Sequence, residues 1–340
     1  MPGLSPDAPI EERLNRLNLV HPDDEEIYAM TPERLTDLFS HTTGHINEAK
    51  LIKSMIWQDY ERLQSGELVP IYSNIRGYWY ERLKPVLGRA RAYAGEPDSG
   101  LRKQYNIMIR AFRQMVLGYQ LFRYADFGFK DDRAPLRHIG EVLPNYILCA
   151  EKTGHFPFLQ DMAEQYGITI ISFHGQPSAL STEYLIADLV KAGVDLAGPL
   201  PVFTIVDFDP AGLSIAENFV EQLEQFGYQG PITPISLVHP KFMSKEQIAA
   251  NRYPLHVSGS QRKKYLRWLD ATAGGLEPYG YGKTYGLEAD AMTYPQFEAV
   301  FVTELHNHLP DGNADAVRRL ALTGQLIDTL ITLHTQRVLG

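Results

Sequence analysis

The spacing of apolar and polar positions divides the chain into two parts with different periodicity. In the first part, apolar side chains recur every three or four residues, which is the period of helices with one buried face. This pattern predicts helices over residues 33–40, 47–63, 75–84 and 110–124. Thr31 and Pro32 provide an N-cap and a first helical residue for the first helix. Gly66 is expected to end the second helix, and Pro85 the third.

The pattern of apolar positions changes near Asn145, where short apolar runs begin to alternate with amphipathic segments. Strands are predicted over residues 146–150, 168–173, 202–206 and 232–238, and helices over 156–166, 180–192 and 213–226. Strict alternation of strand and helix implies an α/β fold with a parallel sheet covered on both faces. Ligands of such sheets bind at the carboxyl ends of the strands, so functional residues are expected there.

Charge is distributed unevenly over these parts. Residues 1–49 carry 3 basic and 10 acidic side chains, residues 50–137 carry 16 and 9, and residues 138–340 carry 13 and 22. A basic segment between acidic flanks is typical of a phosphate-binding module, although helices with Lys and Arg on solvated faces give the same count. We therefore predict three domains: an acidic helical arm over 1–49, a basic helical domain over 50–137, and an α/β domain with a C-terminal helical extension over 138–340.

Composition excludes several classes of protein. With 340 residues, 44% hydrophobic and 21% charged, the chain is neither disordered nor collagen-like nor a coiled coil. No apolar run approaches the roughly 20 residues that cross a bilayer, and no basic, apolar leader begins the sequence, so we expect a soluble cytoplasmic protein without membrane association. The single Cys149 rules out a disulfide framework and a thiolate metal cluster.

Three carboxylates stand at predicted strand ends. Glu151 follows the first strand, and Asp207 and Asp209 follow the third with a spacing that points both to one side of an extended chain. Hard oxygen ligands of this kind suit Mg²⁺, which binds through few carboxylates and keeps its waters for a phosphate substrate. Structural roles are also open for two of these residues. Asp209 before Pro210 is a good helix N-cap, and Glu151 could pair with Lys152 or lie in solvent. Asp207 has no such explanation, since an uncompensated carboxylate after a buried strand is costly.

The ordered set of these motifs resembles a known family. Glu151, the turn 174–178 and the run Asp207-x-Asp209-Pro210-x-Gly212 resemble the Toprim domain, in the version found in the A subunit of type IIB topoisomerases (topoisomerase VI) and the related meiotic double-strand-break transesterase. Upstream, residues 72–80 resemble that family's winged-helix motif, in which an arginine precedes the active tyrosine by four residues. Downstream, residues 285–292 are similar to a late helix start that contains Glu. The resemblance runs from about residue 50 to 308 and implies a winged-helix DNA-binding domain, with residues 92–100 as a loop or wing, followed by a Rossmann-like Toprim domain.

The chemistry expected of Tyr80 follows from its surroundings. A phenol has a pKa near 10, so attack on a phosphodiester needs a cation that favours the phenolate and stabilises the transition state. Arg76 and Tyr80 are four residues apart and share one helix face, where both can meet one phosphate. Tyr80 is therefore the predicted nucleophile and Arg76 the phosphate clamp. Tyr78 is the rival nucleophile, but two residues away on a helix it faces elsewhere.

The resemblance also implies partners. It implies a 5′-phosphotyrosyl link to double-stranded DNA, a homodimer in which one chain's tyrosine meets the other chain's Mg²⁺ site, and a nucleoid-associated protein. Because Gly282-Lys283-Thr284 lacks the upstream glycine of a P-loop, ATP dependence would come from a separate GHKL-type ATPase B subunit. Two alternatives stay open: a Toprim nuclease that hydrolyses DNA without a covalent intermediate, and a non-catalytic DNA-binding dimeric subunit.

Some residues depart from the family pattern or offer competing sites. Trp79 stands where the family usually has tyrosine, Gly77 where an acidic residue often follows the arginine, and His174 where lysine often precedes the glycine. The basic cluster of Arg262, Lys263, Lys264 and Arg267 is predicted to be a solvated face. The histidine pairs His41 and His45, and His306 and His308, lack the context of a metal site.

Overall fold

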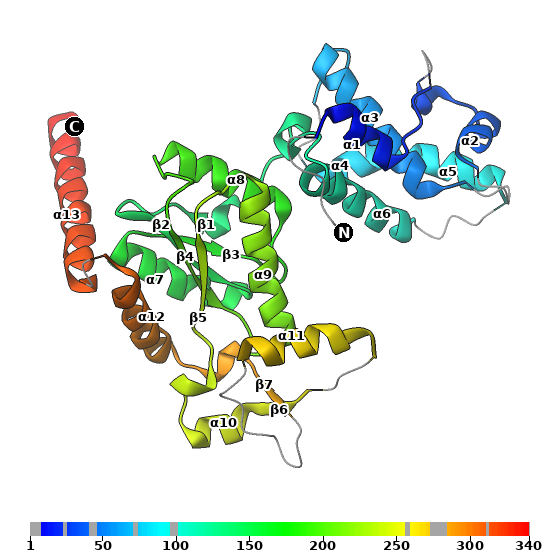
Figure 1. Cartoon of the computed structure of the whole chain (residues 1–340). Coiled ribbons are helices and arrows are strands. Elements are labelled where there is room, and N and C mark those ends of the chain that lie inside the picture. The colour runs from blue at the N-terminus through cyan, green and yellow to red at the C-terminus, as the bar shows by residue number, and fades with distance from the viewer. Residues whose placement is uncertain are drawn as a thin grey trace. The chain divides into compact units, whose positions relative to one another are not determined.

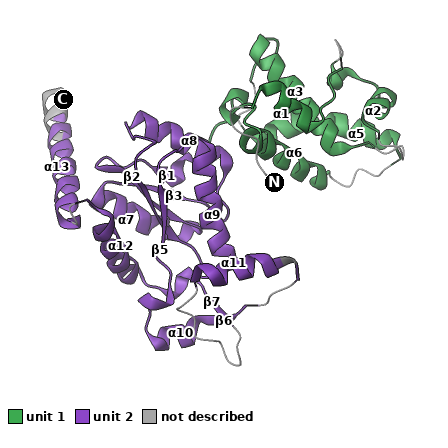
Figure 2. Cartoon of the chain, in the orientation of Figure 1, with its two compact units in different colours: residues 1–132 green, residues 133–340 purple. Residues whose placement is uncertain are grey.

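The computed structural model (Figure 1) describes residues 8–22, 26–40, 46–70, 74–95, 101–255, 259–272, 284–310 and 313–339. Contacts divide the chain into two compact units, Met1–Asp132 and Arg133–Gly340 (Figure 2). We treat each unit separately. The domain boundaries predicted after residues 49 and 137 refer to parts that fold independently, which a division by contacts does not test. They stay a prediction.

Helices are the main regular structure among the described residues of unit 1. Its helices are α1 (Ile10–Leu17), α2 (Pro32–Phe39), α3 (Glu48–Ser65), α4 (Ile75–Tyr78), α5 (Lys84–Tyr93) and α6 (Arg102–Arg113), with π-helical turns over Trp79–Leu83 and Gln114–Gly118. The only β pairing among the described residues of this unit is an isolated bridge between Ser40 and Ile46. The structure thus gives no strand for a wing, and residues 96–100 of the predicted wing lie outside the described residues.

Two predicted helices are confirmed together with their signals. The Thr31 side chain accepts a hydrogen bond from the Arg34 amide at 3.3 Å at the start of α2. Asn47 caps α3 in the same way, and Gly66 ends it with a φ of +79°, a conformation that glycine adopts without strain.

Three helix boundaries in unit 1 were predicted wrongly. The helix predicted over 110–124 begins earlier, at Arg102, and its helical backbone ends at Gly118 after the second π turn. The first turns of α6 place Gln104 in the interior, where its amide donates to Glu48 at 2.9 Å, so a polar residue occupies a core position and hides the periodicity. Pro85 does not end a helix either, since helical backbone continues from α4 through the first π turn into α5. The wider π turn leaves room for a proline in the first turn of α5.

Unit 2 contains a five-stranded mixed sheet. Its strands are β1 (Arg137–His138), β2 (Leu143–Ala150), β3 (Ile168–Ser172), β4 (Leu200–Ile205) and β5 (Ile232–Ser236), in the order β1-β3-β2-β4-β5. Strands β2 to β5 pair in parallel, and β1 pairs antiparallel with β3. The four predicted strands and the parallel α/β fold are confirmed; β1 was missed because two residues show no periodicity.

Helices cover both faces of the sheet. The long helices are α7 (Phe156–Tyr166), α8 (Ala179–Lys191), α9 (Pro210–Gln225), α12 (Tyr294–His308) and α13 (Ala314–Leu339). Side chains that alternate along the strands feed two cores: Leu148 and Phe203 pack with α7 and α12, and Cys149 and Val202 with α8 and α9. This two-sided burial explains why the strands read as continuous apolar runs.

A smaller group of elements follows β5. It consists of α10 (Lys245–Asn251), β6 (Arg252–Pro254), α11 (Arg262–Thr272) and β7 (Tyr285–Leu287), with β6 and β7 paired antiparallel. Leu287 also forms a bridge with Phe208, just beyond the end of β4. The late motif at 285–292 is therefore joined to the Asp207 segment. Within the described ranges, no helix has the length and apolar character needed to span a bilayer.

Candidate active site

Tyr80 lies on the exposed side of the first π turn in unit 1. Its side chain is 48% exposed, and two cations from its own helical segment flank the ring. The Arg76 guanidinium carbon lies 5.9 Å from the ring centroid, and Lys84 Nζ lies 5.0 Å from it. A hydrogen bond with Arg76 and the charge of Arg76 lower the pKa of Tyr80, and Lys84 contributes in the same direction. Arg76 and Tyr80 are thus brought together as predicted.

Lys84 was not identified from the sequence as part of this site. Its position four residues after Tyr80, the same spacing that singled out Arg76, was the available signal. Arg76 itself sits in the turn that Asn74 begins, where the Asn74 side chain accepts a hydrogen bond from the Gly77 amide at 2.7 Å. The other predicted cap residue, Ser73, lies outside the described residues, as does Tyr72.

The two aromatic neighbours of Tyr80 point into the protein. The Tyr78 hydroxyl donates to Asp59 Oδ2 at 2.8 Å in the interior, and burial raises the pKa of Tyr78 well above its ordinary value. Trp79 is 3% exposed and meets Tyr105 edge to face. A buried, hydrogen-bonded phenol cannot reach a DNA phosphate, so Tyr80 is the accessible phenol of this run.

The predicted carboxylates of unit 2 lie at a change of direction in the sheet. The chain passes from β2 to β3 on one side and then returns across β2 to β4 on the other. Glu151 directly follows β2, and Asp207 comes two residues after β4. In parallel sheets, the crevice outside such a topological switch point is the usual ligand site.

Contacts hold Glu151 and Asp207 close together. The Glu151 amide donates to the carbonyl of Ile205 at 3.0 Å, which joins the two strand ends. The Ala289 amide donates to Asp207 Oδ1 at 2.8 Å and fixes that carboxylate beside the 285–292 motif. Burial raises the pKa of Glu151, and the charge of Asp207 and, more weakly, that of Asp209 raise it further. These carboxylates therefore repel one another in the protein.

One ammonium group neutralises part of this charge. Lys152 Nζ lies 2.8 Å from Asp290, 3.3 Å from Asp207 and 3.8 Å from Glu288. Partial burial works against its protonation, but Asp290 and Asp207 raise the pKa of Lys152 to about 12. The charge of Lys152 lowers the pKa of Glu151, but the short ion pairs of Lys152 are with Asp290 and Asp207, which follow β7 and β4. Asp290 was not singled out, although it lies within the late motif.

Asp209 has a well-defined structural role. Its Oδ1 accepts hydrogen bonds from the amides of Ala211 at 2.8 Å and Gly212 at 2.7 Å, so it caps α9 as the alternative interpretation proposed. Its Oδ2 accepts a hydrogen bond from the Tyr253 hydroxyl at 2.8 Å, and partial burial and Asp209 raise the pKa of that phenol. No signal in the sequence pointed to Tyr253.

The donor set can be compared with what Mg²⁺ requires. Within the described ranges, no group of three or more His, Cys, Asp or Glu side chains is arranged to hold a metal ion. Mg²⁺ nevertheless commonly binds through one or two carboxylates and retains several waters. Glu151 and Asp207, which repel each other at a strand-end crevice, fit that mode, whereas both oxygens of Asp209 already accept hydrogen bonds. Mg²⁺ binding through Glu151, Asp207 and Asp209 stays a prediction.

The structure adds no support for a functional role of the basic cluster or the histidine pairs. The cluster on α11 is exposed, and Arg267 pairs with Glu217 at 2.9 Å. His308 Nδ1 lies 2.7 Å from a carbonyl of its own helix, and His306 is exposed. His41, His45, Gly282 and Lys283 lie outside the described residues. His174 and Gly175 both have positive φ, of 52° and 98°, in the turn between β3 and α8.

Comparisons with known proteins do not name a family. No protein-family model matches the sequence, and no curated protein matches it either.

Proposed function

We propose that the chain is a DNA-cleaving transesterase of the topoisomerase VI A-subunit type, which uses Tyr80 as nucleophile and Mg²⁺ as cofactor. In this proposal, unit 1 contributes a winged-helix-like DNA-binding surface, and unit 2 a Toprim domain. The observation that carries the proposal is the exposed Tyr80 phenol between Arg76 and Lys84, next to a tyrosine and a tryptophan that are both buried. An ordinary surface tyrosine needs no such pair of cations.

The reaction that this arrangement supports is a phosphoryl exchange. Tyr80 Oη attacks the phosphorus of a DNA phosphodiester, the new tyrosyl O–P bond forms, and the bond from phosphorus to the 3′-oxygen breaks. The phenol proton passes to solvent, and the departing 3′-oxygen takes up a proton. Because one ester replaces another, the step is reversible and religation needs no added energy source. The lowered pKa of Tyr80 increases the fraction of phenolate available at neutral pH.

Arg76 would act on the same phosphate. Its guanidinium lies over the face of the nucleophile, where it can donate to the non-bridging oxygens and stabilise the extra charge of the transition state. Lys84 would add a second positive charge near the ring. In unit 2, Glu151 and Asp207 would hold Mg²⁺, with Asp209 beside them, and the ion would supply charge neutralisation at the DNA backbone.

Two copies of the chain are part of the proposal. The family resemblance implies that one protomer's Tyr80 meets the Mg²⁺ site of the other, so that a dimer cuts both strands of double-stranded DNA. A separate GHKL-type ATPase subunit would then control strand passage. Nucleoid association in the cytoplasm follows from the proposed substrate.

A denaturing gel tests the proposal. Purified protein is incubated with end-labelled DNA and Mg²⁺, and the reaction is stopped with detergent. The proposal predicts a labelled band at the size of the protein for DNA labelled 3′ of the break, because the protein keeps the 5′ end. Tyr80→Phe removes one oxygen and should abolish this band. Tyr93→Phe is a matched control, since Tyr93 is 53% exposed on α5 without a role in the proposed chemistry.

The other outcomes separate the alternatives. Free cut ends without an adduct, unchanged in Tyr80→Phe, would instead identify a hydrolytic Toprim nuclease. DNA binding without any break would identify a non-catalytic subunit. An adduct that survives in Tyr80→Phe would contradict the assignment of the nucleophile.

A further inference from the structure

The last helix of unit 2, α13, exposes a row of large aliphatic side chains to solvent. Six of its aliphatic residues are each between 46% and 61% exposed: Leu320, Leu322, Leu326, Ile327, Leu330 and Ile331. A surface helix normally turns such residues toward the core and its polar residues toward water. Helix α13 therefore has an outer surface, which we call the α13 leucine face and define by these six residues, that nothing in the described structure covers.

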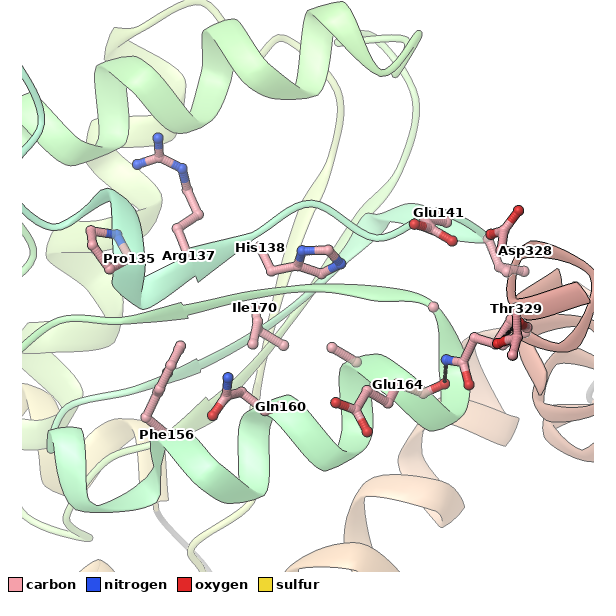
Figure 3. A pocket seen from close by; sticks show the side chains of 15 residues that line it. Pro135, Arg137, His138, Glu141, Phe156, Gln160, Glu164, Ile170, Asp328 and Thr329 are labelled. Carbon is pink, nitrogen blue, oxygen red and sulfur yellow. Dashed lines mark hydrogen bonds between the residues drawn. The ribbon is translucent and has the colours of Figure 1, made fainter. Parts of the chain in front are cut away.

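The inner side of α13 is already occupied. Ala321 is buried against unit 2, and the Gln325 amide donates to the Glu164 carbonyl of α7 at 2.6 Å. Asp328 and Thr329 face the same way and line a pocket of about 510 Å³ between α13, α7 and β1 (Figure 3). Small and polar residues thus make the contact with the body of the unit. Rotating the helix to bury the leucine face would break these contacts. The contacts of the inner side therefore fix the leucine face toward solvent.

The leucine face is at the upper end of what a monomer usually exposes. Six half-exposed Leu and Ile side chains leave roughly 500 Å² of apolar surface open, near the upper limit for stable monomers. A standard two-fold interface covers about 800 Å² on each partner, so this face and its rim come close to what a dimer needs. Asp328 is the only Asp, Glu, Lys or Arg between Arg319 and Arg337, and it lies on the inner side. A continuous uncharged face is what a buried helix contact requires.

We propose that the α13 leucine face packs against the same face of a second copy of this chain, antiparallel and about a two-fold axis. The spacing supports self-pairing, because Leu322 and Leu330 lie four residues before and after Leu326. A two-fold axis through Leu326 sets Leu322 of one copy against Leu330 of the other and Leu326 against itself, as an isologous interface requires. A membrane-surface helix would instead carry Lys and Arg along its polar side, whereas between Arg319 and Arg337 the only charged residue of α13 is Asp328, which lies against the unit.

The proposal deepens the dimer of the proposed function by naming its surface, but it rests on α13 alone. Sedimentation velocity of the full chain without DNA or metal, across roughly 1 to 100 μM, tests it. Wild type should be a dimer. Leu326→Glu should raise the dissociation constant at least about 100-fold, because two carboxylates would meet at the axis. Since Leu326 is 60% exposed, the variant should still fold, with a circular dichroism spectrum like that of wild type.

Two controls make the result specific. Val190→Glu changes another half-exposed aliphatic residue, on α8, and should leave the dimer intact. Leu326→Cys should form an intermolecular disulfide under mild oxidation much faster than Val190→Cys, with no background from the buried native Cys149. Tyr80→Phe should stay dimeric. A dimeric wild type that forms no covalent adduct would count against the proposed function alone.

Other results would overturn the proposal. They are a monomeric wild type over the whole concentration range, a Leu326→Glu variant that sediments like wild type, or equal cross-linking of the two cysteine variants. A monomeric wild type that binds vesicles of phosphatidylcholine and phosphatidylglycerol would assign the face to lipid, and a monomer captured by a different protein would assign it to that protein.

Discussion

Each unit contains a cluster of charged side chains, and the two clusters are built in opposite ways. In unit 1, Asp59 is fully buried and its carboxylate accepts hydrogen bonds from Tyr28, Tyr78 and Arg82. Donors surround this acceptor on all sides, and the Arg82 cation balances its charge. In unit 2, five carboxylates lie near the strand ends, and Lys152 forms ion pairs with three of them, Asp207, Glu288 and Asp290. The other two are Glu151 and Asp209.

The difference separates stability from function. A buried charge with matched partners holds a structure together, and removing one partner is costly. A surplus of negative charge at a ligand crevice destabilises the empty protein and is retained where it binds something positive. Substitutions in the first cluster should therefore change stability, and substitutions in the second should change activity.

Asp59→Ala should have the largest effect on stability. It leaves the Arg82 guanidinium and two phenols without their acceptor and should lower the free energy of unfolding by about 3–5 kcal/mol. Urea unfolding followed by circular dichroism measures this difference. If Asp59→Ala were as stable as wild type, the cluster would not be the stabilising element that its geometry indicates.

Gly212→Ala should have an intermediate effect. A Cβ at this position would lie 1.9 Å from the carbonyl oxygen of Asp207, so the start of α9 and the Asp207 backbone would have to move apart. We expect a loss of about 1–3 kcal/mol in the free energy of unfolding, together with reduced cleavage. Gly88→Ala is the control, since an added Cβ at this glycine of α5 would meet nothing within 4 Å. Equal effects of the two changes would show that the close approach to Asp207 does not matter.

Asp207→Asn and Asp209→Asn should leave stability nearly unchanged. Asparagine still accepts the Ala289 hydrogen bond at 207, and it caps a helix as well as aspartate does at 209. Because Asp207→Asn also relieves the repulsion of Glu151, its melting temperature in chelator should equal or exceed that of wild type. If Asp207 binds the ion, the Mg²⁺ concentration for half-maximal cleavage should rise at least about tenfold. A wild-type Mg²⁺ dependence in Asp207→Asn would remove the metal site from the account.

Arg76→Gln should not change stability measurably, since the side chain is exposed. The rate of adduct formation should fall about 10²-fold or more, because a cation at the phosphate is lost. Arg76 lowers the pKa of Tyr80, so the variant's rate should also rise only at higher pH than the wild-type rate does. Arg76→Lys should restore part of the rate. A pH profile that does not move would show that Arg76 does not act on the phenol.

The sequence predicted the parts of the fold that depend on local periodicity. Parallel strands such as β4 are buried on both faces and alternate with amphipathic helices such as α9, so their order and approximate bounds were readable. Features set by tertiary contacts were not. The polar start of α6 depends on a partner in α3, the π turn that precedes Pro85 has no sequence signal that we used, and β1 is only two residues long.

The candidate site was predicted in the same uneven way. Glu151 and Asp207 were found because strand ends are recognisable, and Tyr80 and Arg76 because their spacing is local. Tyr253 reaches Asp209 from a strand 44 residues away, and such a contact requires knowledge of the chain path. Helical spacing predicted that Tyr78 and Tyr80 face different ways, and Tyr78 is indeed buried while Tyr80 is exposed. The backbone at Tyr80 is a π turn rather than the α-helix that the prediction assumed.

The most direct test of the account is to identify the residue that carries the DNA. After cleavage, the protein is digested with nuclease and trypsin, and the peptide Gly77–Arg82 is analysed by tandem mass spectrometry. The account predicts a nucleotide attached through phosphate to Tyr80, with Tyr78 in the same peptide unmodified. A nucleotide on Tyr78 or on another residue, or cleaved DNA with no modified peptide at all, would contradict it.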